Sequence, residues 1–186
     1  MQLEPNTALI VIDVQEGFDD PSWGPSNNPD CESNIAALVQ AWTASDRPVV
    51  LVRHDSTGER SPLHPSSAGN ALKPVVADAP HELLVSKDVN SAFYGRPDLH
   101  AWLQERGIRQ LVVCGIQTNM CVETTARMAG NLGYDVIVPL DATRTFDLAG
   151  PLGDTLTAGE LAQATAVNLH GGGFARVVTT TEVLAA

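Results

Sequence analysis

Residues 112–125 read Val112-Val-Cys-Gly-Ile-Gln-Thr-Asn-Met-Cys-Val-Glu-Thr-Thr125, which predicts a buried strand that turns sharply into a helix. Cys121 lies at the start of that predicted helix and is a candidate nucleophile. The free amides and the dipole of a helix's first turn favour negative charge, so they make a thiol easier to deprotonate. The same amides can hold an oxyanion. The alternative is that Cys121 only packs as a small buried apolar residue.

Apolar runs alternate with helical patterns along the rest of the chain, which is typical of a parallel sheet with helices on both faces. Strands are predicted at Ala8–Val14, Pro48–Arg53, Glu82–Val85, Gln110–Gly115, Asp135–Leu140 and Ala175–Thr179. Helices are predicted at 30–45, 98–106, 120–132 and 158–170, with a short fifth one after Thr179. Thr157 and Thr179 each begin a Thr-x-x-Glu capping box. The pattern predicts a three-layer, Rossmann-like α/β fold with six parallel strands.

Composition narrows the class of protein. The 186 residues, 44% of them hydrophobic, suit a single domain over 1–186, and the net charge of −11 argues against a nucleic-acid partner. Three separated cysteines without a CxxC pair favour a reducing compartment, so we expect a cytoplasmic protein. The first apolar run ends at Asp13, too early for a signal peptide or a membrane anchor.

Charged residues occur at the ends of two predicted strands. Asp13 interrupts the first apolar strand, and Lys87 follows the third. Ligands of open parallel sheets bind beyond the carboxyl ends of the strands, so both residues are candidates for a site with Cys121. The alternatives are that Asp13 caps a loop and that Lys87 is an ordinary surface lysine.

Taken together, several motifs resemble the isochorismatase-like cysteine hydrolases, a family that includes nicotinamidases and ureidoacrylate amidohydrolases. The resemblance covers almost the whole chain. It rests on Ala8-Leu-Ile-Val-Ile-Asp-Val-Gln15 with Phe18, Lys87, Asn90-Ser-Ala-Phe93, Gly115-Ile-Gln-Thr-Asn-Met-Cys-Val-Glu-Thr124 with Thr125 and Arg127, and Asp141-Ala-Thr143 with Phe146.

The resemblance implies a catalytic triad of Asp13, Lys87 and Cys121. It also implies a cis peptide bond between Ile116 and Gln117, and an oxyanion site at the amides of Gln117 and Cys121. The implied strand order, 3-2-1-4-5-6, places Asp13 next to Cys121. Lys87 would start roughly 10 Å away at ~4.8 Å per strand, so its loop and side chain must bridge that gap.

The residue types then suggest a reaction. Asp13 would take the proton of Cys121, and Lys87 would stabilise the anionic site, which gives a thiolate near neutral pH. The thiolate would attack a carbonyl carbon, and protonated Asp13 would protonate the leaving amine. Water would then hydrolyse the thioester.

A metal ion is not expected, and no cofactor is predicted. Nicotinamidases of the family bind a divalent ion through an Asp-x-His and a later histidine, whereas this chain reads Arg53-His54-Asp55-Ser56 and then His64. An irregular site of His54, Asp55 and His64 is the alternative.

Substrate-binding residues are predicted near the same edge of the sheet. The set is Phe18, Trp23, His54, Leu63, Asn90, Phe93, Tyr94, Thr118 and Phe146. Arg96 stands where relatives commonly continue with Gly-Thr, and the sequence leaves its role open between binding a carboxylate and lying in solvent.

Three functions remain open from the sequence. The first is a metal-independent cysteine amidohydrolase that acts on a small amide, ureido or lactam compound. The second is an isochorismatase-type enzyme that cleaves a vinyl ether, and the third is a thiol redox or binding protein. The expected partners are a small-molecule substrate and further copies of the chain, in a homodimer or homotetramer, with neither nucleic acid nor membrane.

Overall fold

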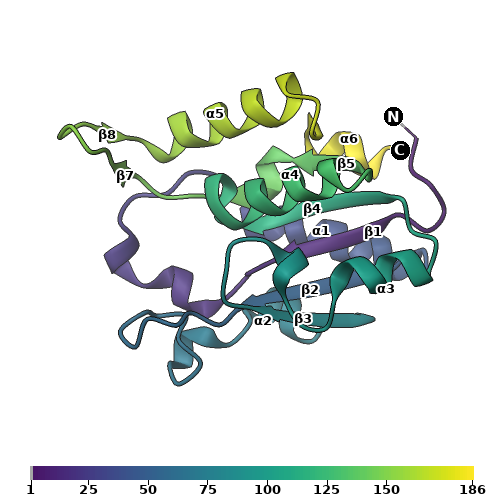
Figure 1. Cartoon of the computed structure of the whole chain (residues 1–186), viewed down its shortest axis with the longest axis horizontal. Coiled ribbons are helices and arrows are strands. Elements are labelled where there is room, and N and C mark those ends of the chain that lie inside the picture. Colours follow the sequence, from purple (N-terminus) through teal and green to yellow (C-terminus); the bar gives the residue numbers. More distant parts are fainter. Residues whose placement is uncertain (1) are drawn as a thin grey trace.

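A parallel sheet forms the centre of the protein in the computed structural model, which describes residues 2–186. Its strand order is β3-β2-β1-β4-β5-β9, which confirms the predicted order with β9 as the sixth strand (Figure 1). The strands are β1 (Ala8–Ile12), β2 (Val49–His54), β3 (Leu83–Lys87), β4 (Gln110–Ile116), β5 (Asp135–Pro139) and β9 (Arg176–Val178). A short strand, β6 (Thr143–Arg144), pairs with the end of β4.

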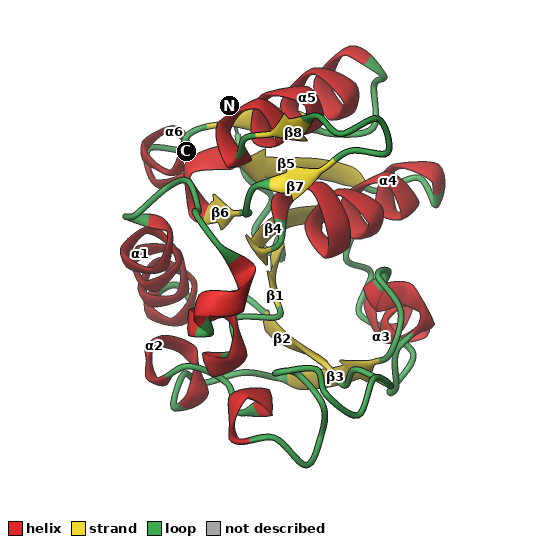
Figure 2. Ribbon diagram, turned by 90° about the vertical axis from the view of Figure 1, so that its left-hand side faces the viewer, coloured by secondary structure: helices red, strands yellow, loops and turns green. Residues whose placement is uncertain are grey.

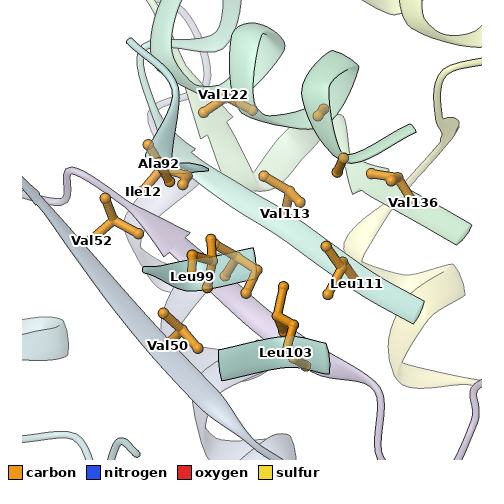
Figure 3. Close-up of a cluster of buried hydrophobic side chains, with 14 of the residues drawn as sticks. Ile12, Val50, Val52, Ala92, Leu99, Leu103, Leu111, Val113, Val122 and Val136 are labelled. Carbon is orange, nitrogen blue, oxygen red and sulfur yellow. The ribbon is translucent and has the colours of Figure 1, made fainter. Parts of the chain in front are cut away.

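Two helical layers cover the sheet because both of its faces are apolar. Ile10 and Ile12 point to one face, where they pack with α3 (Leu99–Glu105), α4 (Glu123–Asn131) and α5 (Ala158–Gly171). Figure 3 shows part of this cluster, with Leu99 and Leu103 of α3 against Val50 and Val52.

The alternate residues of the same strands serve the opposite face. Leu9 and Val11 pack with α1 (Cys31–Ala44), α2 (Pro74–Ala77) and α6 (Thr180–Leu184). Figure 2 shows α1 and α2 on one side of the sheet and α3 and α4 on the other. The three-layer fold is therefore confirmed.

Local capping fixes several helix starts. Thr157 and Glu160 form the capping box of α5, and Thr179 and Glu182 form that of α6, so the short last helix is present as predicted. Asp98 caps α3 by accepting from the amide of Ala101.

The strand-to-helix turn after β4 differs from the predicted helix 120–132. A π-helical turn, Thr118–Val122, precedes α4, because the amide of Val122 donates to the carbonyl of Gln117, five residues earlier, at 3.2 Å. Cys121 therefore lies inside this wide turn and not at the first position of an α-helix.

Short elements make up the long connections. The segments Glu16–Asp19, Pro21–Trp23, Ala68–Asn70, Ala92–Tyr94 and Leu140–Ala142 are 3-10 turns. The sequence patterns missed α2 and an antiparallel hairpin of β7 (Leu148–Ala149) and β8 (Thr155–Leu156), which are too short to show periodicity. This hairpin extends away from the sheet beyond α5 (Figure 1).

The junction of β1 and β4 is unusually tight. Gly115 has φ +125°, and a Cβ atom there would lie 2.0 Å from the carbonyl oxygen of Ile12, so only glycine fits. Directly after Ile12, Asp13 turns the chain with φ 50°, a conformation that aspartate tolerates better than most residues. This junction is the point at which the strand order reverses, where ligands of such sheets bind. Within residues 2–186 no helix has both the length and the apolar character needed to span a membrane.

Candidate active site

A pocket of ≈ 390 Å³ opens at the carboxyl ends of β1, β2 and β4. It contains two members of the implied triad, Asp13 and Cys121. Its lining consists of Asp13, Phe18, Ser22, Trp23, His54, Leu63, Asn90, Gln117, Asn119, Met120, Cys121, Phe146, Asp147 and Leu148.

A buried ion pair forms the base of the site. The Nζ atom of Lys87 lies 2.5 Å from Oδ2 of Asp13, and both side chains have zero exposure. Lys87 is the last residue of β3, whereas the predicted strand ended at Val85 and placed Lys87 beyond it. It pairs in register with His54 of β2. The expected gap of two strands is bridged because the long lysine side chain runs beneath His54 to the end of β1, where it also lies 3.0 Å from Nδ1 of that histidine.

The second oxygen of Asp13 has no partner. Oδ1 is buried and makes no hydrogen bond to any of the described residues, while a carboxylate oxygen of Asp13, a ring nitrogen of His54 and Sγ of Cys121 all lie within 4.8 Å of one another. Burial raises the pKa of the Asp13 carboxyl above its ordinary 3.8, and the Lys87 charge acts in the opposite direction. Asp13 thus combines a fixed orientation with a free oxygen on the pocket side.

The surroundings of Cys121 favour the neutral thiol and act against the thiolate near neutral pH that the residue types suggested. Burial, and then the negative charge of Asp13, raise the pKa of Cys121 from 9.0 to about 12. The residue is only 7% exposed, and this desolvation outweighs the opposing effect of the Lys87 charge. The thiol of Cys121 also donates to Oδ1 of Asn90, at 3.8 Å.

His54 belongs to the same polar group as the triad. Its main chain is fixed by Gln15, which accepts from the His54 amide at 2.8 Å and donates to the His54 carbonyl at 3.0 Å. Burial, followed by the nearby Lys87 charge, lowers the pKa of the imidazole below its ordinary 6.5. His54 is therefore neutral at pH 7.

The peptide bond between Ile116 and Gln117 is cis, as the resemblance implied. Ile116 is fully buried beneath the pocket, and Gln117 lines it. Gln117 carries one of the two amides that the resemblance assigns to the oxyanion site, and it lies at the edge of the pocket.

Three aromatic rings form one wall of the pocket. Trp23 lies 5.2 Å from Phe18 and 5.5 Å from Phe146, measured between ring centroids, and the planes of Trp23 and Phe146 are inclined by only 27°. The indole nitrogen of Trp23 donates to the carbonyl of Gly17 at 2.8 Å, which fixes the ring. Leu63 packs with this cluster, so four of the predicted pocket residues lie together.

Three other predicted pocket residues lie elsewhere. Phe93 stacks on Tyr134. Tyr94 is 70% exposed and lies with Arg96 in a separate hollow. Thr118 is buried, and its hydroxyl donates to the Thr143 hydroxyl at 2.8 Å. Sequence reasoning missed Ser22, Asn119, Met120, Asp147 and Leu148. The positions of Asn119 and Met120 between Gln117 and Cys121 were a usable signal, because both follow the end of β4.

Two possible metal-ligand atoms of the site are engaged by Lys87. Oδ2 of Asp13 and Nδ1 of His54 both face the buried ammonium of Lys87, which would repel a second cation. Asp55 is held by Arg53 at 2.9 Å, and Nδ1 of His64 lies 2.7 Å from the Ser66 hydroxyl. In the described part of the chain His54, Asp55 and His64 do not form a common cluster of ligand atoms.

Comparison with known proteins adds a family likeness to this geometry. A family model described as an isochorismatase domain matches residues 7–182. The chain is 35% identical to the isochorismatase family protein YrdC of Bacillus subtilis (strain 168) over 182 residues, which cover 98% of this chain and 96% of that one. It is 30% identical to nicotinamidase 3 of Arabidopsis thaliana over a match that covers 94% of this chain and 87% of that one. A crystal structure of an isochorismatase-family protein from Chromobacterium violaceum ATCC 12472 superposes with a TM-score of 0.93 at 40% identity, covering 100% of this chain and 95% of that one.

Proposed function

The chain belongs to the isochorismatase family of hydrolases, and from this premise we propose that it is a metal-independent cysteine amidohydrolase. Its substrate would be a small amide, ureido or lactam compound whose C–N bond is cleaved through a thioester on Cys121. One observation carries the proposal: the thiol of Cys121 shares a pocket with the unpartnered oxygen of Asp13, whose other oxygen is held by Lys87.

The first half of the reaction forms the thioester. As Sγ of Cys121 bonds to the carbonyl carbon, its proton passes to Oδ1 of Asp13, and the amide of Gln117 donates to the developing oxyanion. Asp13 then gives that proton to the nitrogen as the C–N bond breaks, so ammonia or an amine leaves neutral. Lys87 keeps its charge throughout and holds the carboxyl in place.

The second half repeats the proton transfer with water. Asp13 takes a proton from water, the oxygen attacks the thioester carbon, and the C–S bond breaks. The proton returns from Asp13 to sulfur, which restores the thiol and releases a carboxylic acid. The balance is one amide plus one water to one acid plus one amine.

The raised pKa values fit this sequence. A thiol with a pKa of about 12 is not ionised beforehand at pH 7, so its proton must leave while sulfur attacks. A carboxyl whose pKa is raised by burial is a stronger base than an ordinary aspartate. The site therefore favours proton transfer within the reaction over a stored thiolate.

The test is intact-protein mass spectrometry on acid-quenched samples after brief incubation with a panel of small amides, together with detection of released ammonia or amine. We expect an acyl adduct that maps to Cys121 and that is lost in Cys121→Ala and Asp13→Asn. Cys31→Ala is the matched control, since Cys31 is also a buried thiol but lies on the opposite face of the sheet. This control should retain the adduct.

A different result would point to the second candidate reaction. If no amide acylates Cys121 and Cys121→Ala still cleaves a vinyl ether such as isochorismate, the covalent mechanism is wrong. Metal independence is tested separately: the turnover rate should be the same after dialysis against EDTA and after addition of Zn²⁺ or Mg²⁺.

A further inference from the structure

The pocket offers a ligand little positive charge. No lysine or arginine is among its lining residues, and its charged members are Asp13 and Asp147, both acidic. The ammonium of Lys87 is paired with Asp13, and the lysine side chain is not exposed. A carboxylate in the pocket would therefore meet the carboxylate of Asp147 and no unpaired cation, on a chain whose net charge is already −11.

His54 has a fixed tautomer, because of the group that faces its Nδ1 atom. That neighbour is the ammonium of Lys87, 3.0 Å away, and an ammonium can donate but not accept a hydrogen bond. Nδ1 must therefore carry the lone pair, and the proton of the neutral ring lies on Nε2. His54 lines the pocket, and because its Nδ1 atom already contacts Lys87, the polar group that it can offer a ligand is the donor Nε2–H.

The side-chain amide of Asn119 is likewise oriented by a neighbour, Thr145. The buried Thr145 hydroxyl donates to Oδ1 of Asn119, which leaves the amide nitrogen of this pocket-lining side chain as its free polar group. Thr145 is itself fixed, since its backbone amide donates to Oδ1 of Asn27 at 2.8 Å and its carbonyl accepts from the Asn27 amide at 3.2 Å. Asn119 thus also presents a donor.

We propose that His54 and Asn119 are specificity-determining donors that select a neutral, flat amide with a hydrogen-bond acceptor, such as a second carbonyl or a ring nitrogen, besides the scissile group. This inference rests on the proposed amidohydrolase function. The flat part of such a substrate lies against the wall of Phe18, Trp23 and Phe146. Carboxylates are rejected by the acidic lining, and groups that only donate find no acceptor opposite these two residues.

Binding can be tested without turnover. Dissociation constants for four benzamides are measured by NMR titration on Cys121→Ala: 3-acetylbenzamide, 3-ethylbenzamide, 3-carboxybenzamide and 3-(aminomethyl)benzamide. The acetyl compound should bind about 3- to 10-fold more tightly than the ethyl compound, the range expected for one neutral hydrogen bond, and the anion should bind most weakly. Equal affinities, tighter binding of the anion, or no binding of the acetyl compound overturn the proposal.

Two variants assign the effect to Asn119. Thr145→Val removes the hydroxyl that orients Asn119 and should abolish the preference for acetyl over ethyl, whereas Thr145→Ser should retain it. The tautomer of His54 is read independently from long-range ¹H–¹⁵N spectra of protein labelled at histidine, which should show a protonated Nε2 at pH 7. A protonated Nδ1 overturns the proposal. These results are distinguishable from failure of the amidohydrolase mechanism, which is decided by the acyl adduct on Cys121.

Discussion

Replacing Lys87 by methionine should strongly destabilise the fold. The substitution keeps the volume of the side chain but removes the charge that lies 2.5 Å from Asp13, where neither side chain is exposed. Removal of one partner of a buried ion pair leaves an uncompensated charge and costs about 3–5 kcal/mol. We therefore expect the free energy of unfolding, measured by urea denaturation at pH 8, to fall by about that amount.

The pH dependence of this loss has a definite sign. Burial already raises the pKa of Asp13, and without Lys87 this burial loses the largest of the influences that oppose it. A carboxyl with a raised pKa in the folded state stabilises the fold below its unfolded pKa and loses that contribution as pH rises through the folded pKa. The deficit of Lys87→Met should accordingly be smaller at pH 5 than at pH 8, because protonation of Asp13 relieves it.

A double variant and a surface control decide whether the reasoning holds. Asp13→Asn combined with Lys87→Met removes both charges and should recover most of the lost stability. Arg176→Met breaks an exposed pair with Asp135, whose side chains are 42% and 48% exposed, and should cost less than about 1 kcal/mol. If Lys87→Met is as stable as the wild type, or if the double variant is no more stable than the single one, the buried ion pair does not have the energetic role assigned to it.

Three further predictions concern stability. Because the pKa of Cys121 is raised from 9.0 to about 12, its contribution is complete below pH 9 and is lost as pH rises toward 12. The free energy of unfolding in urea, measured between about pH 9.5 and 11, should fall with pH by about 1.4 kcal/mol per pH unit less in Cys121→Ala than in the wild type, and an equal slope would contradict the buried thiol. Gly115→Ala should destabilise by about 3 kcal/mol or more in urea, since its methyl group would overlap the carbonyl of Ile12, and a cost below about 1 kcal/mol would refute that contact. Thr157→Ala removes the cap of α5 and should lower the free energy of unfolding by about 1 kcal/mol, with Thr157→Ser as the tolerated control.

Much of the fold could be predicted because its determinants are local. Strand β4 and the helix after it were predictable from a continuous apolar run followed by helical periodicity. The two capping boxes at Thr157 and Thr179 involve residues three apart, so their signal survives without any tertiary information. Hairpin β7–β8 lacked such a signal, since its strands have only two residues each.

The candidate site was predictable in its residue types but not in its electrostatics. Asp13, Lys87 and Cys121 could be identified as charged or reactive residues near strand ends, and the family resemblance joined them into a triad. The pKa of a thiol, however, depends on how much water the folded chain removes from it, and the burial of Cys121 reverses the shift inferred from a helix terminus.

The sequence by itself determined the alternation of strands and helices, the order of the chemical groups along the chain and the family, because these follow from short-range patterns. Only the tertiary structure decided which atoms of those groups are engaged. Lys87 contacts Nδ1 of His54, which lies 33 positions away in the sequence. The Thr145 hydroxyl contacts Oδ1 of Asn119, which lies 26 positions away. Such contacts depend on sheet register and on the path of loops, and the periodicity of a single strand decides which face a residue occupies but not which atoms it meets there.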